Sequence, residues 1–232
     1  MIFPSLDRVK AIAPGYDIVP VYMEILSDVR TPISVLKALK QVSSHTYLLE
    51  SADNSNHWGR YSFLGYDPKI ELFCKNHTMT IKDGTTRTFE CSDPAAEIRN
   101  ILSQYKSPRL EELPTFTGGF VGYFACEYIR YIESTLDFPT PDDDSAMVND
   151  VDLMLFDKVI AFDHYKNKIY LIANISTNDL ERNYNKAELE LKALADLVVN
   201  GKEADVPKGI LKTEFTSEFT KDEFEAVVKK TQ

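Results

Sequence analysis

The sequence predicts an α+β fold, with antiparallel β-sheets in a sandwich-like arrangement and helices packed on the outside. Three observations predict it. Short stretches of alternating apolar and polar residues, typical of half-buried strands, recur along the chain. Turn residues separate them, at Asn76 and at Asp83-Gly84, a dipeptide typical of tight hairpins. These strands do not alternate with helices in the βαβ order of a parallel sheet.

The strands are predicted from this alternation and from the turns between them. The segment DIVPVYMEIL, for example, alternates apolar and polar residues up to Leu26. The predicted strands cover residues 19–26, 47–49, 61–64, 69–74, 77–82, 85–90, 116–124, 153–162 and 168–174.

The helices are predicted from capping residues and from apolar residues at helical spacing. Ser5 is a candidate N-cap, and Thr31-Pro32 and Asp93-Pro94 each place an N-cap before a proline in the first turn. The predicted helices cover residues 5–13, a segment from Thr31 that buries Ile33, Leu36, Leu39 and Val42, residues 93–105, a short segment up to Ile132, residues 179–199 and a last helix from Thr220.

Composition excludes several classes of protein. The chain has 232 residues, of which 44% are hydrophobic, so it can bury a sizeable core. Its net charge of −10 argues against nucleic acid as a partner, since a phosphate backbone is bound mainly through Lys and Arg. No apolar run is long enough to span a bilayer, and the N-terminus does not resemble a signal peptide. We therefore expect a cytoplasmic protein without a membrane or nucleic-acid partner.

Familiar catalytic and metal motifs are missing from the sequence. The glycines of GGFVG (118–122) lack the lysine of a phosphate-binding loop, so close packing of strands is the better interpretation. Consecutive aspartates 142–144 cannot easily converge on one ion, and we interpret them as a solvated loop. The three cysteines have neither disulfide nor zinc spacing. We expect no cofactor, no metal site and no catalytic residues in this chain.

One short motif predicts a binding site. The sequence LLES (48–51) ends a strand, and GRYSFLG (59–65) follows shortly after. An amino-acid ligand needs an acceptor for its ammonium group, a donor for its carboxylate and an apolar slot for its side chain. Glu50, Ser51 and the neighbouring apolar strand residues could supply all three.

These motifs carry a resemblance to a known family. LLES, GRYSFLG, GGFVGYFACEYIRYIE (118–133) and LMLFDKVIAFDH (153–164) together resemble the first half of anthranilate synthase component I. The resemblance implies the fold of that enzyme's N-terminal domain and a pocket for L-tryptophan, its feedback inhibitor. It places Ser51 in this pocket, with Glu50, Leu49, Arg60 and Tyr61 as further candidates.

The resemblance also divides the chain. Residues 1–212 would form the tryptophan-sensing regulatory domain, and residues 213–232 a linker and the first helix of the chorismate-binding catalytic domain. Thr220 and Glu223 form a capping box, yet the helical pattern has no C-terminal stop signal, so we expect the native protein to continue.

In the full-length enzyme, the family implies conversion of chorismate and glutamine-derived ammonia to anthranilate. It also implies Mg²⁺ and a glutamine amidotransferase partner subunit. The chain by itself is expected to be inactive.

Two alternatives stay open at this point. The large subunit of aminodeoxychorismate synthase belongs to the same class, and LLES does not separate the two enzymes. A stand-alone amino-acid-binding regulator is the second alternative, and the open-ended last helix argues against it.

Overall fold

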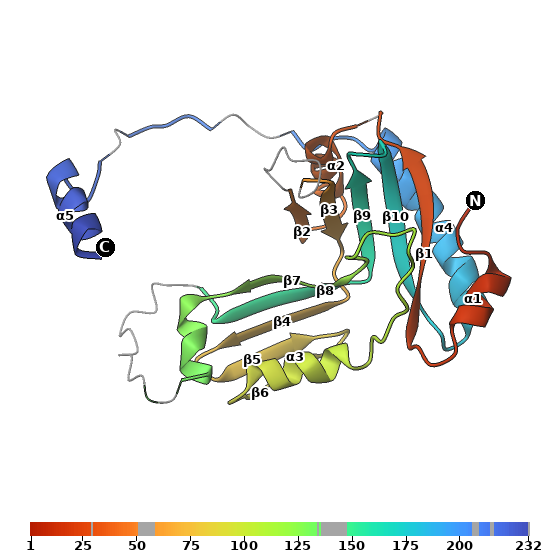
Figure 1. The fold of residues 1–232 in the computed structure, drawn as a ribbon, viewed down its shortest axis with the longest axis horizontal. Helices are drawn as coiled ribbons and strands as arrows, with labels where there is room; N and C mark the ends of the chain where they lie inside the picture. The colour runs from red at the N-terminus through yellow and green to blue at the C-terminus, as the bar shows by residue number, and fades with distance from the viewer. Residues whose placement is uncertain are drawn as a thin grey trace.

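The fold contains two antiparallel sheets of five strands each (Figure 1). The computed structural model describes residues 1–28, 30–50, 59–133, 135, 148–205, 209–213 and 216–231. The first sheet has the strand order β1 (Ile18–Leu26), β10 (Lys168–Ser176), β9 (Lys158–Asp163), β3 (Tyr61–Tyr66) and β2 (Thr46–Leu49). The second sheet has the order β6 (Thr86–Glu90), β5 (Thr78–Lys82), β4 (Ile70–Lys75), β8 (Val151–Phe156) and β7 (Gly119–Phe124). The predicted α+β class is confirmed.

The helices begin where their capping residues predict. Ser5 Oγ accepts a hydrogen bond from the Arg8 amide, Thr31 Oγ1 from Ser34 and Asp93 Oδ1 from Ala96. The helices are α1 (Leu6–Ile12), α2 (Pro32–Leu39), α3 (Pro94–Leu102), the 3₁₀ helix η1 (Cys126–Tyr131), α4 (Leu180–Asn200) and α5 (Lys221–Thr231).

The first sheet is buried on both faces. One face packs against α1, α2 and α4, and α4 contributes residues at helical spacing, among them Tyr184, Leu191 and Val198. The other face is covered by the segment after α3, through Leu110 and Leu113. This double burial explains the nearly continuous apolar sequence of β10.

The second sheet has a hydrophobic cluster of its own. Its inner residues, such as Leu72, Met79 and Leu153, pack against Ile98 and Ile101 of α3. Each cluster draws its strand residues from one sheet only. These clusters therefore do not show the two sheets packed face to face, as the predicted sandwich-like arrangement would require.

A bent two-stranded ribbon joins the sheets instead. Strands β3 and β9 pair in the first sheet, and their continuations β4 and β8 pair in the second. The ribbon bends at residues 67–69 on one strand and at Asp157 on the other, where the Lys69 amide still donates to the Leu155 carbonyl at 2.7 Å. The prediction of one strand over residues 153–162 was wrong, because the apolar run changes sheets at Asp157.

Two helices differ from the prediction in extent and in buried face. Helix α2 ends at Leu39 and buries Val35 and Ala38 besides Leu39, whereas Ile33 and Val42 are exposed. Val42 lies beyond the helix end, so it cannot share that face. Helix α3 ends at Leu102, and residues up to 105 continue only as tight turns with bonds between residues i and i+3.

Helix α5 lies away from both sheets (Figure 1). The predicted capping box is confirmed, since the Thr220 amide donates to Glu223 Oε2 at 2.8 Å and the Glu223 amide to Thr220 Oγ1 at 3.4 Å. None of the residues of α5 is buried, and Phe224, Val227 and Val228 are exposed.

Candidate functional site

The candidate tryptophan site lies at the edge of the first sheet, where β2 ends and β3 begins. Leu49 is the last residue of β2, pairs with Phe63 of β3 and is about half exposed. Glu50 follows it as an exposed residue. Ser51, the central residue of the predicted site, lies in the segment 51–58, outside the described residues. The described part of the site is therefore formed by the residues on either side of this segment.

Arg60 is bound to a buried carboxylate. Its Nε donates to Asp163 Oδ1 at 3.1 Å and its Nη2 to Oδ2 at 2.6 Å, and the Asp163 side chain is fully buried. The amides of Tyr165 and Lys166 also donate to Oδ1, at 3.1 and 3.0 Å. The Asp163 carboxylate thus holds in place both Arg60, which precedes β3, and the turn between β9 and β10.

The hydrogen bonds and the charge of Arg60 lower the pKa of Asp163 by more than burial raises it. Burial acts to raise the pKa of Asp163, but the hydrogen bond and the charge of Arg60, together with the turn amides, bring the pKa below its ordinary value. Asp163 is therefore held as a carboxylate, and its charge is compensated by Arg60.

Aromatic rings surround the guanidinium of Arg60. Its carbon Cζ lies 4.8 Å from the centroid of the Tyr61 ring and 5.6 Å from that of Tyr165. Tyr61 stacks on Phe63, with 5.7 Å between their centroids and 30° between their planes. Burial, followed by the nearby charge of Asp163, raises the pKa of Tyr61. The described side chains thus combine a planar apolar surface with a cation.

The guanidinium keeps donors for a ligand. An arginine has five N–H donors, and the pair with Asp163 uses two of them. The Arg60 side chain is 33% exposed, so the others are partly accessible to an anionic group. Arg60, Tyr61 and Leu49 flank the segment that contains Ser51, and the glutamate Glu50 enters it.

On the other face of β3, the buried Ser62 contacts the exposed His164. Ser62 Oγ lies 2.7 Å from His164 Nε2, and Ser62 is buried. A serine next to a histidine suggests a nucleophile only if a third group orients the histidine. The adjacent carboxylate, Asp163, is bound to Arg60 instead, so the structural role predicted for the turn at Asp163-His164 is the better interpretation.

The glycines of GGFVG have the packing role that the sequence predicts. A β-carbon on Gly122 would collide with the carbonyl oxygen of Asp152 on the paired strand β8. A β-carbon on Gly118 would lie 2.6 Å from the side-chain nitrogen Nδ2 of Asn174. Close approach of chains, and not phosphate binding, accounts for both residues.

Asp157 and Asn174 line a cavity between the sheets, and the sequence analysis did not single them out. The available signal was the charged pair Asp157-Lys158 inside the apolar run 153–162. Among the described residues, no group of three or more His, Cys, Asp or Glu side chains is placed to hold a metal ion. Aspartates 142–144 lie outside those residues. No helix in the described part of the chain is long and apolar enough to cross a membrane.

Comparison with known proteins shows the family to which this chain belongs. The family described as chorismate binding enzyme matches residues 45–232, which include both strands of the candidate site and helix α5. This chain belongs to the chorismate binding enzymes. Within that family, it is 36% identical over 197 residues to anthranilate synthase component 1 of Acetivibrio thermocellus. It is 32% identical over 237 residues to the protein of the same name from Aquifex aeolicus.

The alignments with these two relatives include most of this chain but less than half of each relative. The alignments include 84% and 97% of this chain but only 39% and 46% of the two relatives. The chain thus spans less than half the length of these chorismate binding enzymes. A crystal structure of anthranilate synthase component I from Streptococcus pneumoniae TIGR4 matches 89% of this chain and 44% of that chain, at 24% identity and a TM-score of 0.49.

Proposed function

We propose that this chain is the tryptophan-binding, regulatory part of an anthranilate synthase component I. The observation that carries the proposal is the similarity to relatives of that name across most of this chain. These relatives favour the anthranilate enzyme over aminodeoxychorismate synthase. The whole protein would convert chorismate and ammonia to anthranilate, and a glutamine amidotransferase subunit would supply the ammonia.

The candidate site supports an amino-acid ligand through its charges. In this proposal the carboxylate of Glu50 accepts the ligand's ammonium group, while the Ser51 hydroxyl and the free N–H donors of Arg60 bind its carboxylate. Leu49 and the rings of Tyr61 and Phe63 offer an apolar surface for the indole. Because Asp163 already compensates Arg60, the site does not have to bury an unpaired cation when it is empty.

Affinity in such a site depends on the polar contacts. Burying an indole of roughly 150–250 Å² at about 25 cal/mol/Å² contributes at most about 4–6 kcal/mol. The loss of translational and rotational freedom on association costs a comparable amount. Tryptophan and phenylalanine share the groups that these polar contacts bind. Selectivity between them therefore depends on the fit of the indole, which the bound ammonium and carboxylate groups orient.

Inhibition would arise from coupling between two parts of the whole enzyme. Tryptophan can inhibit only to the extent that it binds the inactive arrangement more tightly than the active one. Residues 1–212 would carry the sensor, and residues 213–232 would lead into the catalytic part. In this proposal the catalytic steps belong to the catalytic part of the whole enzyme, and we assign none of them to this chain.

Calorimetric titration of the 232-residue chain tests the proposal. We expect one tryptophan to bind per chain, and phenylalanine to bind at least tenfold more weakly. A parallel fluorescence assay with chorismate, ammonia and Mg²⁺ should give no anthranilate above a protein-free control. Equal binding of both amino acids, or no binding of tryptophan, would contradict the sensor role, and anthranilate formation would contradict the assignment of catalysis elsewhere.

A further inference from the structure

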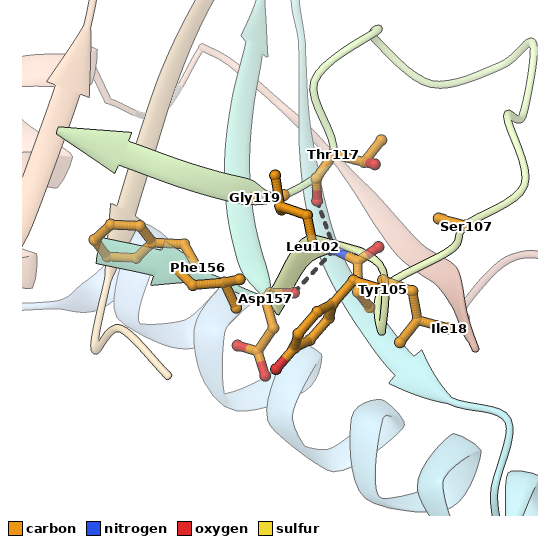
Figure 2. Close-up of a pocket in the computed structure, with 11 residues that line it drawn as sticks. Ile18, Leu102, Tyr105, Ser107, Thr117, Gly119, Phe156 and Asp157 are labelled. Carbon is orange, nitrogen blue, oxygen red and sulfur yellow. Dashed lines mark hydrogen bonds between the residues drawn. The ribbon is translucent and has the colours of Figure 1, made fainter. Parts of the chain in front are cut away.

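A cavity lies at the bend where the chain passes from the second sheet to the first. It has a volume of about 100 Å³. Its apolar wall comes from three different segments, namely Leu102 at the end of α3, Tyr105 after it, and Leu155 and Phe156 at the end of β8. Asp157 and Asn174 form its polar side, and in Figure 2 the Asp157 carboxylate and the Tyr105 ring extend in the same direction.

A second, more polar hollow adjoins the first. It has a volume of about 220 Å³ and shares Asp157 and Asn174 with the apolar cavity. Its lining includes the three lysines Lys69, Lys158 and Lys186, besides Glu190. The two hollows together thus offer an apolar slot, a carboxylate and several ammonium groups around one point of the fold.

Within the part of the chain that the structure describes, the Asp157 carboxylate has no partner on another residue. Among the described residues, no cation lies within ion-pair distance of it and no hydrogen bond from another residue reaches it. Burial raises its pKa, and the charges of Lys158 and Lys69 act in the opposite direction. An acid that serves only to bend the chain would be better replaced by a neutral residue, because burying a charge without a partner destabilises the fold. A perturbed acid in a cleft is instead typical of functional sites.

Asn174 is oriented by the main chain around it. Its Nδ2 donates to the carbonyls of Thr117 at 2.6 Å and of Asp157 at 3.1 Å (Figure 2). Both donors of the amide are therefore used, and the side chain is held between the Thr117 and Asp157 main chains. Asn174 thus fixes the main chain at the point where the two hollows meet.

The lysines provide the opposite charge on the other side of Asp157. Lys69 Nζ lies 5.2 Å from the centroid of the Tyr105 ring, which also lines the apolar cavity. Among the described residues, the contact of Lys158 to an acid is a long one, 3.7 Å from its Nζ to Asp67 Oδ2. Both ammonium groups can therefore donate hydrogen bonds to a further carboxylate near the boundary of the two hollows.

We propose that this junction binds a small aliphatic α-amino acid. The ligand's ammonium group would contact the Asp157 carboxylate, its carboxylate would face Lys69 and Lys158, and its side chain would enter the apolar cavity. At about 100 Å³ that cavity is smaller than the cavity of about 150 Å³ known to hold benzene, so it favours a valine-sized side chain over an indole. This site is separate from the proposed tryptophan site and does not depend on it.

Titration of the 232-residue chain with L-valine, followed by calorimetry, tests the inference. We expect saturable binding in the millimolar range or tighter, at least tenfold weaker binding of glycine, and no competition by L-tryptophan. Asp157→Asn should weaken the binding of valine at least tenfold and leave the binding of tryptophan unchanged. Asp83→Asn, in an exposed hairpin turn of the second sheet, is the matched control and should change neither.

A second measurement does not depend on a variant. Addition of valine to ¹⁵N-labelled chain should shift the amide signals of Asp157 and Asn174, and not those around Arg60. Absence of valine binding, unchanged affinity in Asp157→Asn or shifts confined to the Arg60 region would each overturn the inference. Loss of tryptophan binding alone would count only against the proposed regulatory function.

Discussion

Arg60 binds both oxygens of the fully buried Asp163 carboxylate through two hydrogen bonds, although the two residues lie 103 positions apart in the sequence. This pair ties the entry of β3 to the end of β9. It also determines the orientation of the guanidinium that we place in the tryptophan site.

Replacing Arg60 with methionine should destabilise the chain substantially. Removing one partner of a buried ion pair leaves an uncompensated charge and costs about 3–5 kcal/mol. We expect about 3 kcal/mol, since two turn amides still bind Asp163, as measured by urea unfolding. Arg87→Met, which removes an exposed pair with Asp83, is the control and should cost less than about 1 kcal/mol. Equal losses in the two variants would refute the structural role of the Arg60 pair.

Asp163 should also make stability depend on acid pH. Its pKa is lower in the folded chain than its ordinary value. Its contribution is therefore complete above the pKa of the unfolded state, about 3.9, and is lost as pH falls through the lower pKa of the folded state. The free energy of unfolding of the wild type should decline below about pH 4 more steeply than that of Asp163→Asn. Parallel pH profiles of the two proteins would show that the pair does not lower this pKa.

Gly122 should not tolerate a side chain. In Gly122→Ala the new methyl group would collide with the carbonyl oxygen of Asp152, and main-chain atoms of a paired strand cannot easily move away. Overpacking of this kind costs about 1–3 kcal/mol, and we expect the upper end of that range in thermal or urea unfolding. Gly209→Ala is the control, since nothing lies within 4 Å of its added β-carbon. A wild-type stability of Gly122→Ala would argue against the packing role of GGFVG.

Ser51 should matter for inhibition by tryptophan. Loss of its hydroxyl in Ser51→Ala is expected to cost about 1–3 kcal/mol of ligand binding, or roughly tenfold to a hundredfold in the inhibition constant. The measurement belongs in the intact enzyme, where inhibition can be assayed. Ser44→Ala, at an exposed serine before β2, should leave inhibition unchanged. An inhibition constant that does not respond to Ser51→Ala would remove Ser51 from the site.

Helix α5 should be only transiently formed in a dilute solution of this chain. Its capping box favours a helical start, but the helix has 11 residues, no buried side chain and an exposed apolar stripe. Isolated helices of that length are marginal in water. Amide hydrogen exchange should therefore show little protection over residues 222–230 and strong protection over α4, which serves as the internal control. Strong protection of both helices in a monomer would show that α5 packs on the rest of the chain.

Features of the fold that depend on neighbouring residues could be predicted from the sequence, and features that depend on distant residues could not. The caps at Ser5, Thr31, Asp93 and Thr220 were predictable because each depends on neighbouring residues alone. The bend at Asp157 was not, since Asp157 and Lys158 interrupt the apolar run without indicating a bend. Only the pairing partners, far away in sequence, reveal the change of sheet.

The candidate site shows the same distinction. Arg60 and Tyr61 could be named from a motif, but the acid that binds Arg60 could not, because it comes from a strand about a hundred residues later. The placement of Ser51 stays a prediction. The cavity at Asp157 depends on segments from α3, β8 and β10, and no local pattern links these segments.

The bent ribbon has a consequence for how this region can be divided by genetic means. The chain leaves the first sheet after β3, completes the second sheet and returns through β8 into β9. A single cut in the gene therefore cannot yield one sheet without strands of the other, whereas removal of an internal segment could. The second sheet is thus topologically an insertion into the first, and recombination can exchange it as a unit only with two crossovers, one on each strand of the ribbon.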